Sequence, residues 1–173
     1  CAKPPPAYES KYTPDTTNQL APDPRLVVDR GNDGVLTAMF SGDSLTAGFY
    51  ATTPEDAFPA LVAAGLGNVN LVKAAVAHQT AVVVAGVVDV PPGLNLAVIE
   101  LGTNDVGART PLTDFRSQYR ALLDKVRNKN SAAAILCLGT WTLAGDAYDG
   151  IISEECQQSG GKYVELKSLF SDE

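Results

Sequence analysis

Two short polar segments of this sequence contain residue types that could carry acyl-transfer chemistry. Gly42-Asp43-Ser44 follows the apolar run 35–40, and Gly102-Thr103-Asn104-Asp105 follows the apolar run 96–101. A serine hydroxyl is a weak nucleophile, and it must be placed where a base can take its proton and a carbonyl carbon can approach. Ser44, on a tight turn that leaves a predicted strand, is exposed in that way. We therefore expect Ser44 to be a nucleophile.

The elements that position these segments follow from the alternation of short apolar runs with longer segments of helical spacing. Such alternation is typical of strand-helix-strand units that build a parallel sheet. Strands are predicted at 35–40, 70–76, 96–101, 133–138 and 162–166, and helices at 57–64 (with Gly65 as its stop), after Thr80, at 112–129 and at 148–158. This order predicts a three-layer α/β/α fold with a doubly wound, five-stranded parallel sheet of the flavodoxin-like kind. Ligands bind beyond the carboxyl ends of such strands, which is where both polar segments lie.

The bulk composition bounds the remaining possibilities. Residues 1–26 are rich in proline and show no periodicity, so we expect a linker followed by one domain over 27–173. The net charge of −7, without a basic cluster, argues against nucleic-acid partners. The apolar-biased stretch 71–91 is interrupted by polar residues and does not predict a membrane-spanning helix. No metal-ligand clustering and no glycine-rich nucleotide motif is present, so no cofactor is expected.

Taken together, the two polar segments resemble the blocks of the SGNH (GDSL-type) serine hydrolase family. Gly42-Asp43-Ser44-Leu45 is similar to the block that names the family, and Gly102-Thr103-Asn104-Asp105 to its G-x-N-D block about sixty residues later. The resemblance extends over residues 35–170 and implies an ester hydrolase of the SGNH-hydrolase fold. It assigns Ser44 as nucleophile and amide donor, and the Asn104 side chain as an oxyanion-hole donor. Asp43, Gly102 and Asp105 are expected to support the loops, the two acids by side-chain to backbone hydrogen bonds.

One departure from the family lies in its second block. That block ends in a glycine whose amide contributes to the oxyanion hole, and His78 stands at the matching position here. A histidine keeps the backbone N–H, so His78 is a candidate amide donor. A positive φ at this position costs energy for any residue other than glycine.

The second departure is the base. The family takes its base from a D-x-x-H block near the C-terminus, in which the histidine deprotonates the serine. The sequence contains one histidine, His78, and Ala75 stands three residues before it. Three explanations remain open. The block lies in a segment absent from this sequence, which we favour; His78 serves as the base; or catalysis has been lost and the pocket only binds.

The three cysteines bear on the compartment. Cys1 and the Ala-Lys-Pro-Pro-Pro that follows resemble a processed bacterial lipoprotein, which predicts a lipid-anchored protein of the cell envelope. Cys137 and Cys156 could then form a disulfide, because oxidising conditions permit one, although two buried free thiols are equally compatible with the sequence.

These observations predict a serine esterase that cleaves a small acyl ester, with a carbohydrate as the expected alcohol by analogy with the family. The alternatives are a lipid ester or thioester hydrolase, and a non-catalytic lipoprotein that binds glycans or lipids. Membrane anchoring through Cys1 is expected, whereas the oligomeric state is left open.

Overall fold

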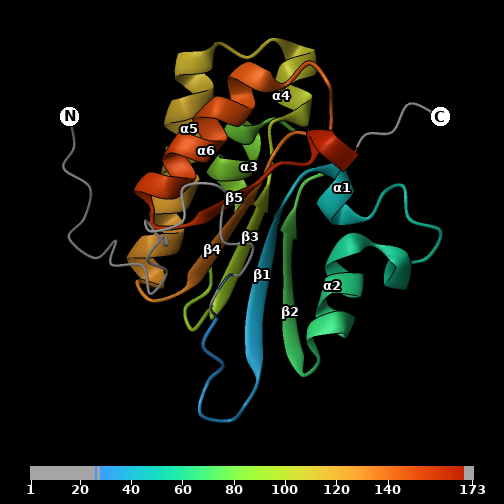
Figure 1. Ribbon diagram of the computed structural model, residues 1–173, viewed down its shortest axis with the longest axis vertical. Coiled ribbons are helices and arrows are strands. Elements are labelled where there is room, and N and C mark those ends of the chain that lie inside the picture. Colours follow the sequence, from blue (N-terminus) through green and yellow to red (C-terminus); the bar gives the residue numbers. More distant parts are fainter. Residues whose placement is uncertain (1–25, 27, 170–173) are drawn as a thin grey trace.

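The computed structural model describes residue 26 and residues 28–169, so Cys1 and nearly all of the predicted linker lie outside the described residues. Five parallel strands form one sheet in the order β2-β1-β3-β4-β5 (Figure 1). Their bounds are β1 Leu36–Gly42, β2 Val69–Ala75, β3 Leu96–Glu100, β4 Ala134–Leu138 and β5 Lys162–Val164. The predicted doubly wound parallel sheet is confirmed, and each predicted strand is found within a few residues of its expected bounds.

The sheet divides the core into two parts, and helices cover each of its faces. On one face, buried side chains of β1, β3 and β4 pack against α3 (Ala81–Val87), α5 (Leu112–Lys129) and α6 (Asp146–Gln158). On the other face, Phe40 of β1 packs edge to face on Phe58, with ring centroids 5.8 Å apart. Phe58 begins α2 (Phe58–Leu66), which Figure 1 shows on the opposite side of the sheet from α5 and α6. The central strands are therefore buried on both faces, which explains their near-continuous apolar sequences.

The helix predicted at 57–64 has different ends in the structure. Residues Pro54–Asp56 form a separate 3₁₀ turn, and α2 continues through Gly65 to Leu66. The left-handed φ of 64° that ends the helix belongs to Gly67. Glycine inside a helix costs only about 1 kcal/mol, so Gly65 is tolerated and does not stop the helix.

Two short helices were not predicted. They are α1 (Ser44–Ala47) and α4 (Thr103–Ala108), and each begins directly at one of the polar segments. Helices of four and six residues are too short to show an apolar periodicity. They nevertheless set the positions of Ser44 and Asn104.

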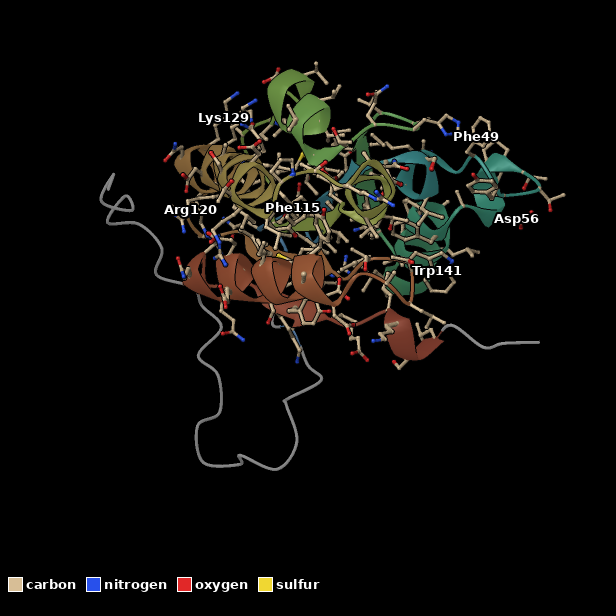
Figure 2. All side chains as sticks on the ribbon, turned by 90° about the horizontal axis from the view of Figure 1, so that it is seen from above. Phe49, Asp56, Phe115, Arg120, Lys129 and Trp141 are labelled. Carbon is tan, nitrogen blue, oxygen red and sulfur yellow. A yellow bond between two sulfur atoms is a disulfide. The ribbon has the colours of Figure 1, made fainter. Side chains whose placement is uncertain are left out.

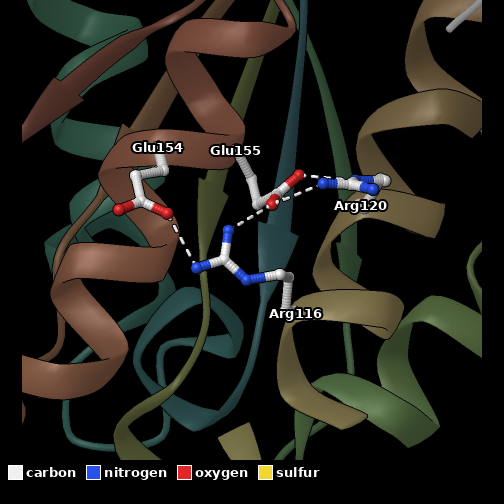
Figure 3. A network of polar contacts seen from close by, with 4 residues as sticks. All are labelled: Arg116, Arg120, Glu154 and Glu155. Carbon is white, nitrogen blue, oxygen red and sulfur yellow. Dashed lines mark hydrogen bonds and ion pairs between the residues drawn. The ribbon is translucent and has the colours of Figure 1, made fainter. Parts of the chain in front are cut away.

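Helix α6 is joined to α5 by apolar and ionic contacts and to the sheet by a covalent bond. Phe115 and Tyr148 pack edge to face with ring centroids 5.0 Å apart, and Phe115 lies well inside the molecule (Figure 2). Arg116 of α5 forms ion pairs with the exposed Glu154 and the buried Glu155 of α6, and Arg120 of α5 forms a second ion pair with Glu155 (Figure 3). A disulfide between Cys137 of β4 and Cys156 of α6 fixes α6 to the sheet.

The described residues contain neither a membrane-spanning helix nor a cluster of metal-ligating side chains. None of the helices in residues 28–169 is both long and apolar enough to cross a membrane. Within the same part of the chain, no group of three or more histidine, cysteine or acidic side chains is arranged to hold a metal ion.

Candidate active site

The two polar segments meet at the carboxyl edge of the sheet. Because β1 and β3 are adjacent and Gly42 pairs with Glu100, the residues that follow these strands lie side by side. Ser44 begins α1, and Asn104 lies in the first turn of α4. Both contribute to one cavity of about 410 Å³. Its lining residues are Asp43, Ser44, Leu45, Tyr50, Thr103, Asn104 and Trp141.

Ser44 is held in place by the residues on either side of it. Asp43 caps α1, since its Oδ1 accepts a hydrogen bond from the Leu45 N–H at 3.0 Å. Gly42 allows a close approach of the chain, because a Cβ at this position would lie 2.1 Å from Thr46 Oγ1 and 2.4 Å from the Glu100 carbonyl oxygen. Ser44 is 6% exposed, so it is more buried than the sequence predicted, and it lines the cavity.

Asn104 is oriented by two hydrogen bonds from its Nδ2. One goes to Asp43 Oδ2 at 3.1 Å, and the other goes to the carbonyl oxygen of Gln79 at 2.9 Å. A primary amide has two N–H hydrogens. Both are therefore engaged in the absence of a substrate, and Asn104 links the turn before α1 to the loop that follows β2.

That loop contains His78. The His78 backbone has a φ of 61°, so the histidine adopts the left-handed conformation that the sequence comparison associated with a glycine. Its ring packs edge to face on Phe49, with centroids 4.8 Å apart, and does not line the cavity of Ser44. Asp105 fixes the end of the same loop, because its Oδ2 accepts a hydrogen bond from the Ala81 N–H at 2.9 Å. The structure therefore places Asp43 and Asp105 where side-chain to backbone hydrogen bonds hold the loops.

The other two candidate donors are the backbone N–H groups of Ser44 and His78. Within the described part of the chain, the N–H groups of Ser44 and His78 donate to no other group. With the Asn104 amide, they are the three groups that the family resemblance implies as oxyanion donors, and this assignment stays a prediction.

The acids of this edge are buried, and burial raises their pKa values. Burial raises the pKa of Asp43, opposed by the hydrogen bond from Leu45. The pKa of Asp105 is raised in the same way, opposed by the hydrogen bond from Ala81. The pKa of Glu100 lies well above its ordinary range, first because of burial and second because of the negative charge on Asp43. Low dielectric and a neighbouring like charge both favour the neutral acid.

The sequence matches one known protein family, and this match identifies the class of reaction. The model of the GDSL-like lipase/acylhydrolase family matches residues 40–173. The chain belongs to this family. As a GDSL-like acylhydrolase it is an ester hydrolase, and it acts on small-molecule esters.

Solved structures show that the fold is shared with other SGNH hydrolases. The SGNH-hydrolase family esterase AlinE4 is 22% identical, with a TM-score of 0.66 over 84% of this chain and 86% of that protein. Esterase EstA from Pseudoalteromonas sp. is 18% identical, with a TM-score of 0.59 over 75% and 76%. A carbohydrate esterase family 2 enzyme with a carbohydrate-binding domain, from Corynascus thermopiles (Myceliophthora fergusii), is 16% identical, with a TM-score of 0.59 over 87% and 61%. None of the curated proteins compared with this chain matches it significantly.

Sequence reasoning about this GDSL-like acylhydrolase missed three residues of the site. Tyr50 and Trp141 line the cavity, with exposed fractions of 73% and 38%. Trp141 follows β4. Its backbone N–H donates to Thr103 Oγ1 at 2.9 Å, which connects Trp141 to the segment that contains Asn104. Trp141 could have been found from the sequence, because it follows the end of a predicted strand, as both polar segments do. Glu100 also had a signal, since it is the one charged residue in the apolar run 96–101.

Proposed function

We propose that this acylhydrolase is a serine esterase that removes a small acyl group from a carbohydrate through an acyl-serine intermediate. The observation that carries the proposal is the shared cavity, in which Ser44 and Asn104 face the same space of about 410 Å³. A nucleophile and an oxyanion donor must both reach one carbonyl group, and this arrangement makes that possible.

In the proposed reaction, Ser44 Oγ attacks the carbonyl carbon of the ester while its proton passes to a base. The carbonyl oxygen becomes an oxyanion that accepts hydrogen bonds from the N–H groups of Ser44 and His78 and from Asn104 Nδ2. Breakdown of the intermediate releases the alcohol, which takes up the proton, and leaves the acyl group on Ser44. Water then attacks the acyl-serine, which yields the carboxylic acid and restores the hydroxyl.

Asn104 has to exchange one hydrogen bond during this reaction, because both of its amide hydrogens are engaged. Gln79 offers a neutral carbonyl oxygen as acceptor, whereas Asp43 is a carboxyl group. Hydrogen bonds to charged acceptors are roughly twice as strong as those to neutral ones. We therefore expect the oxyanion to replace the Gln79 oxygen while the bond to Asp43 is retained.

Ser44 is tested by labelling with a fluorophosphonate probe together with hydrolysis of a p-nitrophenyl ester. Ser44→Ala should abolish both. Ser41→Ala is a matched control, because Ser41 is also buried and its hydroxyl has no partner among the described residues. Loss of labelling in Ser41→Ala as well, or none in the wild type, would count against the proposal.

His78→Ala distinguishes the possible bases in the same assay. The imidazole lies against Phe49 and away from the cavity lining, which favours the amide-donor role over the base. We expect labelling to survive in His78→Ala, because alanine keeps the backbone N–H. Labelling lost equally in His78→Ala and Ser44→Ala would identify His78 as the base.

The carbohydrate alcohol is supported by the aromatic rings at the mouth of the cavity. Tyr50 and Trp141 line the cavity, and aromatic rings of this kind can stack on the C–H groups of a sugar ring. The carbohydrate esterase among the structures of similar fold is consistent with this choice.

Trp141→Leu should lower kcat/KM for an acetylated sugar and leave kcat/KM for ethyl acetate unchanged. Leu143→Ala, an exposed residue outside the cavity lining, is the control. Equal losses on both esters would remove the sugar from the proposal.

We also propose that the protein works outside the cytoplasm. The support is the Cys137–Cys156 disulfide, since such bonds persist in oxidising compartments. Peptide mapping of protein from its native source, without reduction, should recover the linked cysteine peptides. Recovery of both cysteines as free thiols would contradict this location.

A further inference from the structure

The carboxyl group of Glu100 lies beneath the candidate active site and has no role in the reaction described so far. Its residue is 1% exposed, at the end of β3. Thr46 Oγ1 donates to its Oε2 at 2.9 Å, and its Oε1 is buried with no hydrogen-bond partner among the described residues. A Cβ at Gly42 would lie 2.9 Å from Oε2, so the glycine of the first polar segment leaves room for this side chain. Glu100 is therefore enclosed by the turn that carries Ser44.

Asp43 connects Glu100 to the catalytic groups. The side chains of Asp43 and Glu100 lie within hydrogen-bonding reach of each other. Asp43 also accepts hydrogen bonds from the Leu45 N–H at the start of α1 and from Asn104 Nδ2. One carboxyl group thus contacts the acid below it, the helix that begins with Ser44, and the expected oxyanion donor.

Two buried carboxyl groups in contact do not both ionise, because the second charge is opposed by the first and by the low dielectric. Besides burial, the charge on His78 lowers the pKa of Asp43, and the charge on Asp43 raises the pKa of Asp105. The charge on Glu100 adds to the effect of burial in raising the pKa of Tyr119 of α5. Glu100 has the greater rise in pKa, with burial as the main cause. Burial and the charge on Asp43 both favour the neutral form of Glu100.

We propose that Glu100 is a positioning residue of the oxyanion hole, a neutral acid that donates a hydrogen bond to Asp43 and thereby holds Asn104. The inference rests on the proposed function. A protonated Glu100 converts one buried acceptor into a donor, and Asp43 keeps the negative charge. The charged Asp43 retains one hydrogen of the Asn104 amide, which leaves the other free to turn from Gln79 to the oxyanion.

Two substitutions of Glu100 separate positioning from packing. Glutamine keeps a donor for Asp43 and an acceptor for Thr46, whereas leucine fills similar volume with neither. In Glu100→Leu we expect kcat to fall by roughly 10- to 100-fold with KM changed by less than about 2-fold, since only an interaction made in the transition state is weakened. Glu100→Gln should regain most of that activity. A kcat in Glu100→Leu equal to that of the wild type would overturn the proposal.

The pH profile gives a readout that packing alone would not change. The wild type should lose kcat at alkaline pH, where Glu100 gives up its proton and the hydrogen bond to Asp43 becomes a repulsion. Glu100→Gln has no such proton, so its alkaline limb should be absent or displaced. Glu155→Gln is the matched control, because Glu155 is also 1% exposed and lies on α6 with arginine partners. An identical alkaline limb in all three proteins would contradict the role of Glu100.

A measurement that needs no activity keeps this inference separate from the proposed function. The side-chain amide signals of Asn104, assigned in ¹H–¹⁵N spectra with Asn104→Asp, should shift in Glu100→Leu and stay near their wild-type positions in Glu100→Gln and Glu155→Gln. Signals that do not move in Glu100→Leu would refute the positioning role. If they move as expected in a protein that hydrolyses no ester, the network stands and the esterase proposal fails.

Discussion

Two buried glutamates of this protein, Glu100 and Glu155, are equally inaccessible and yet behave in opposite ways. Each is 1% exposed. Burial raises the pKa of both, but Arg120 and Arg116 bind Glu155 and bring its pKa below the ordinary value, whereas Glu100 faces the carboxyl group of Asp43 and its pKa lies well above. Figure 3 shows Glu155 between the two guanidinium groups.

The difference separates a stabilising interface from a site prepared for chemistry. Between α5 and α6, Glu155 accepts hydrogen bonds of 2.7 to 2.8 Å from two arginines and its charge is compensated. At the carboxyl edge of the sheet, burial raises the pKa values of Asp43, Glu100 and Asp105, and single oxygens of Glu100 and Asp105 have no hydrogen-bond partner in the described part of the chain. Figure 2 shows Trp141, at that edge, and Arg120 toward opposite ends of the molecule. Uncompensated burial of this kind is typical of functional sites.

Among the substitutions that test this difference, Asn104→Ala is expected to have the largest effect on activity. Loss of one oxyanion donor should lower kcat by about 10²- to 10³-fold, or roughly 2.7–4 kcal/mol in the barrier. The free energy of unfolding should change little, because the side chain is only partly buried. Steady-state kinetics and urea unfolding on the same preparation check both parts. A loss of stability that accounts for the lost activity would show that the edge is as structural as the α5–α6 interface.

Removal of the disulfide is expected to lower the stability and to leave the activity unchanged. Replacing Cys137 and Cys156 together by alanine should lower the free energy of unfolding by about 3 kcal/mol, as expected for a loop of this length. Esterase activity at a temperature where the variant is folded should stay unchanged, since neither cysteine lines the cavity. Thermal unfolding and kcat/KM measure the two quantities. A specific fall in kcat without loss of fold would mean that α6 also positions the site.

Much of the fold and part of the candidate site could be predicted from the sequence. The helix at 112–129 was predicted with the bounds that the structure has, because its periodicity extends over five turns and its apolar residues face the core. The sheet followed from five apolar runs. The expected location of Ser44 and Asn104 at one edge followed from the rule for parallel strands, and the structure brings them to one cavity.

The remaining parts depend on contacts between distant segments, which a single sequence does not reveal. That Glu100 meets Asp43 depends on the pairing of β1 with β3, and that Trp141 joins the cavity depends on β4 lying beside β3. The left-handed backbone of His78 could be anticipated only through the family resemblance, because a histidine by itself does not signal a positive φ. The C-terminal end of α2 was misplaced because Gly65 and Gly67 both offer a stop.

A smaller effect is expected when the compensated glutamate is removed. Glu155→Leu leaves Arg116 and Arg120 without this partner, but their side chains are 36% and 51% exposed and can be hydrated again. We therefore expect a loss of about 1–3 kcal/mol in the free energy of unfolding, below the range for a pair broken in the deep interior. Activity should be retained. Urea unfolding measures the loss, and a variant as stable as the wild type would show that the arginines contribute nothing net at this interface.

The smallest change at any one pH is expected in the slope of stability against pH, and it has opposite signs for the two glutamates. Glu155 has a lowered pKa in the folded protein, so its stabilisation is present above the unfolded value of 4.5 and is lost as pH falls below it. Glu100 has a raised pKa, so the folded protein holds a proton that the unfolded chain releases, and stability is lost as pH rises above 4.5. Each slope is at most about 1.4 kcal/mol per pH unit for one group.

Urea unfolding of the wild type and of both variants across pH measures these slopes. Glu155→Gln should have a flatter acid limb than the wild type, and Glu100→Gln should have a flatter alkaline limb. If both variants flatten the same limb, the two glutamates do not differ in protonation, and the distinction between the two regions is wrong.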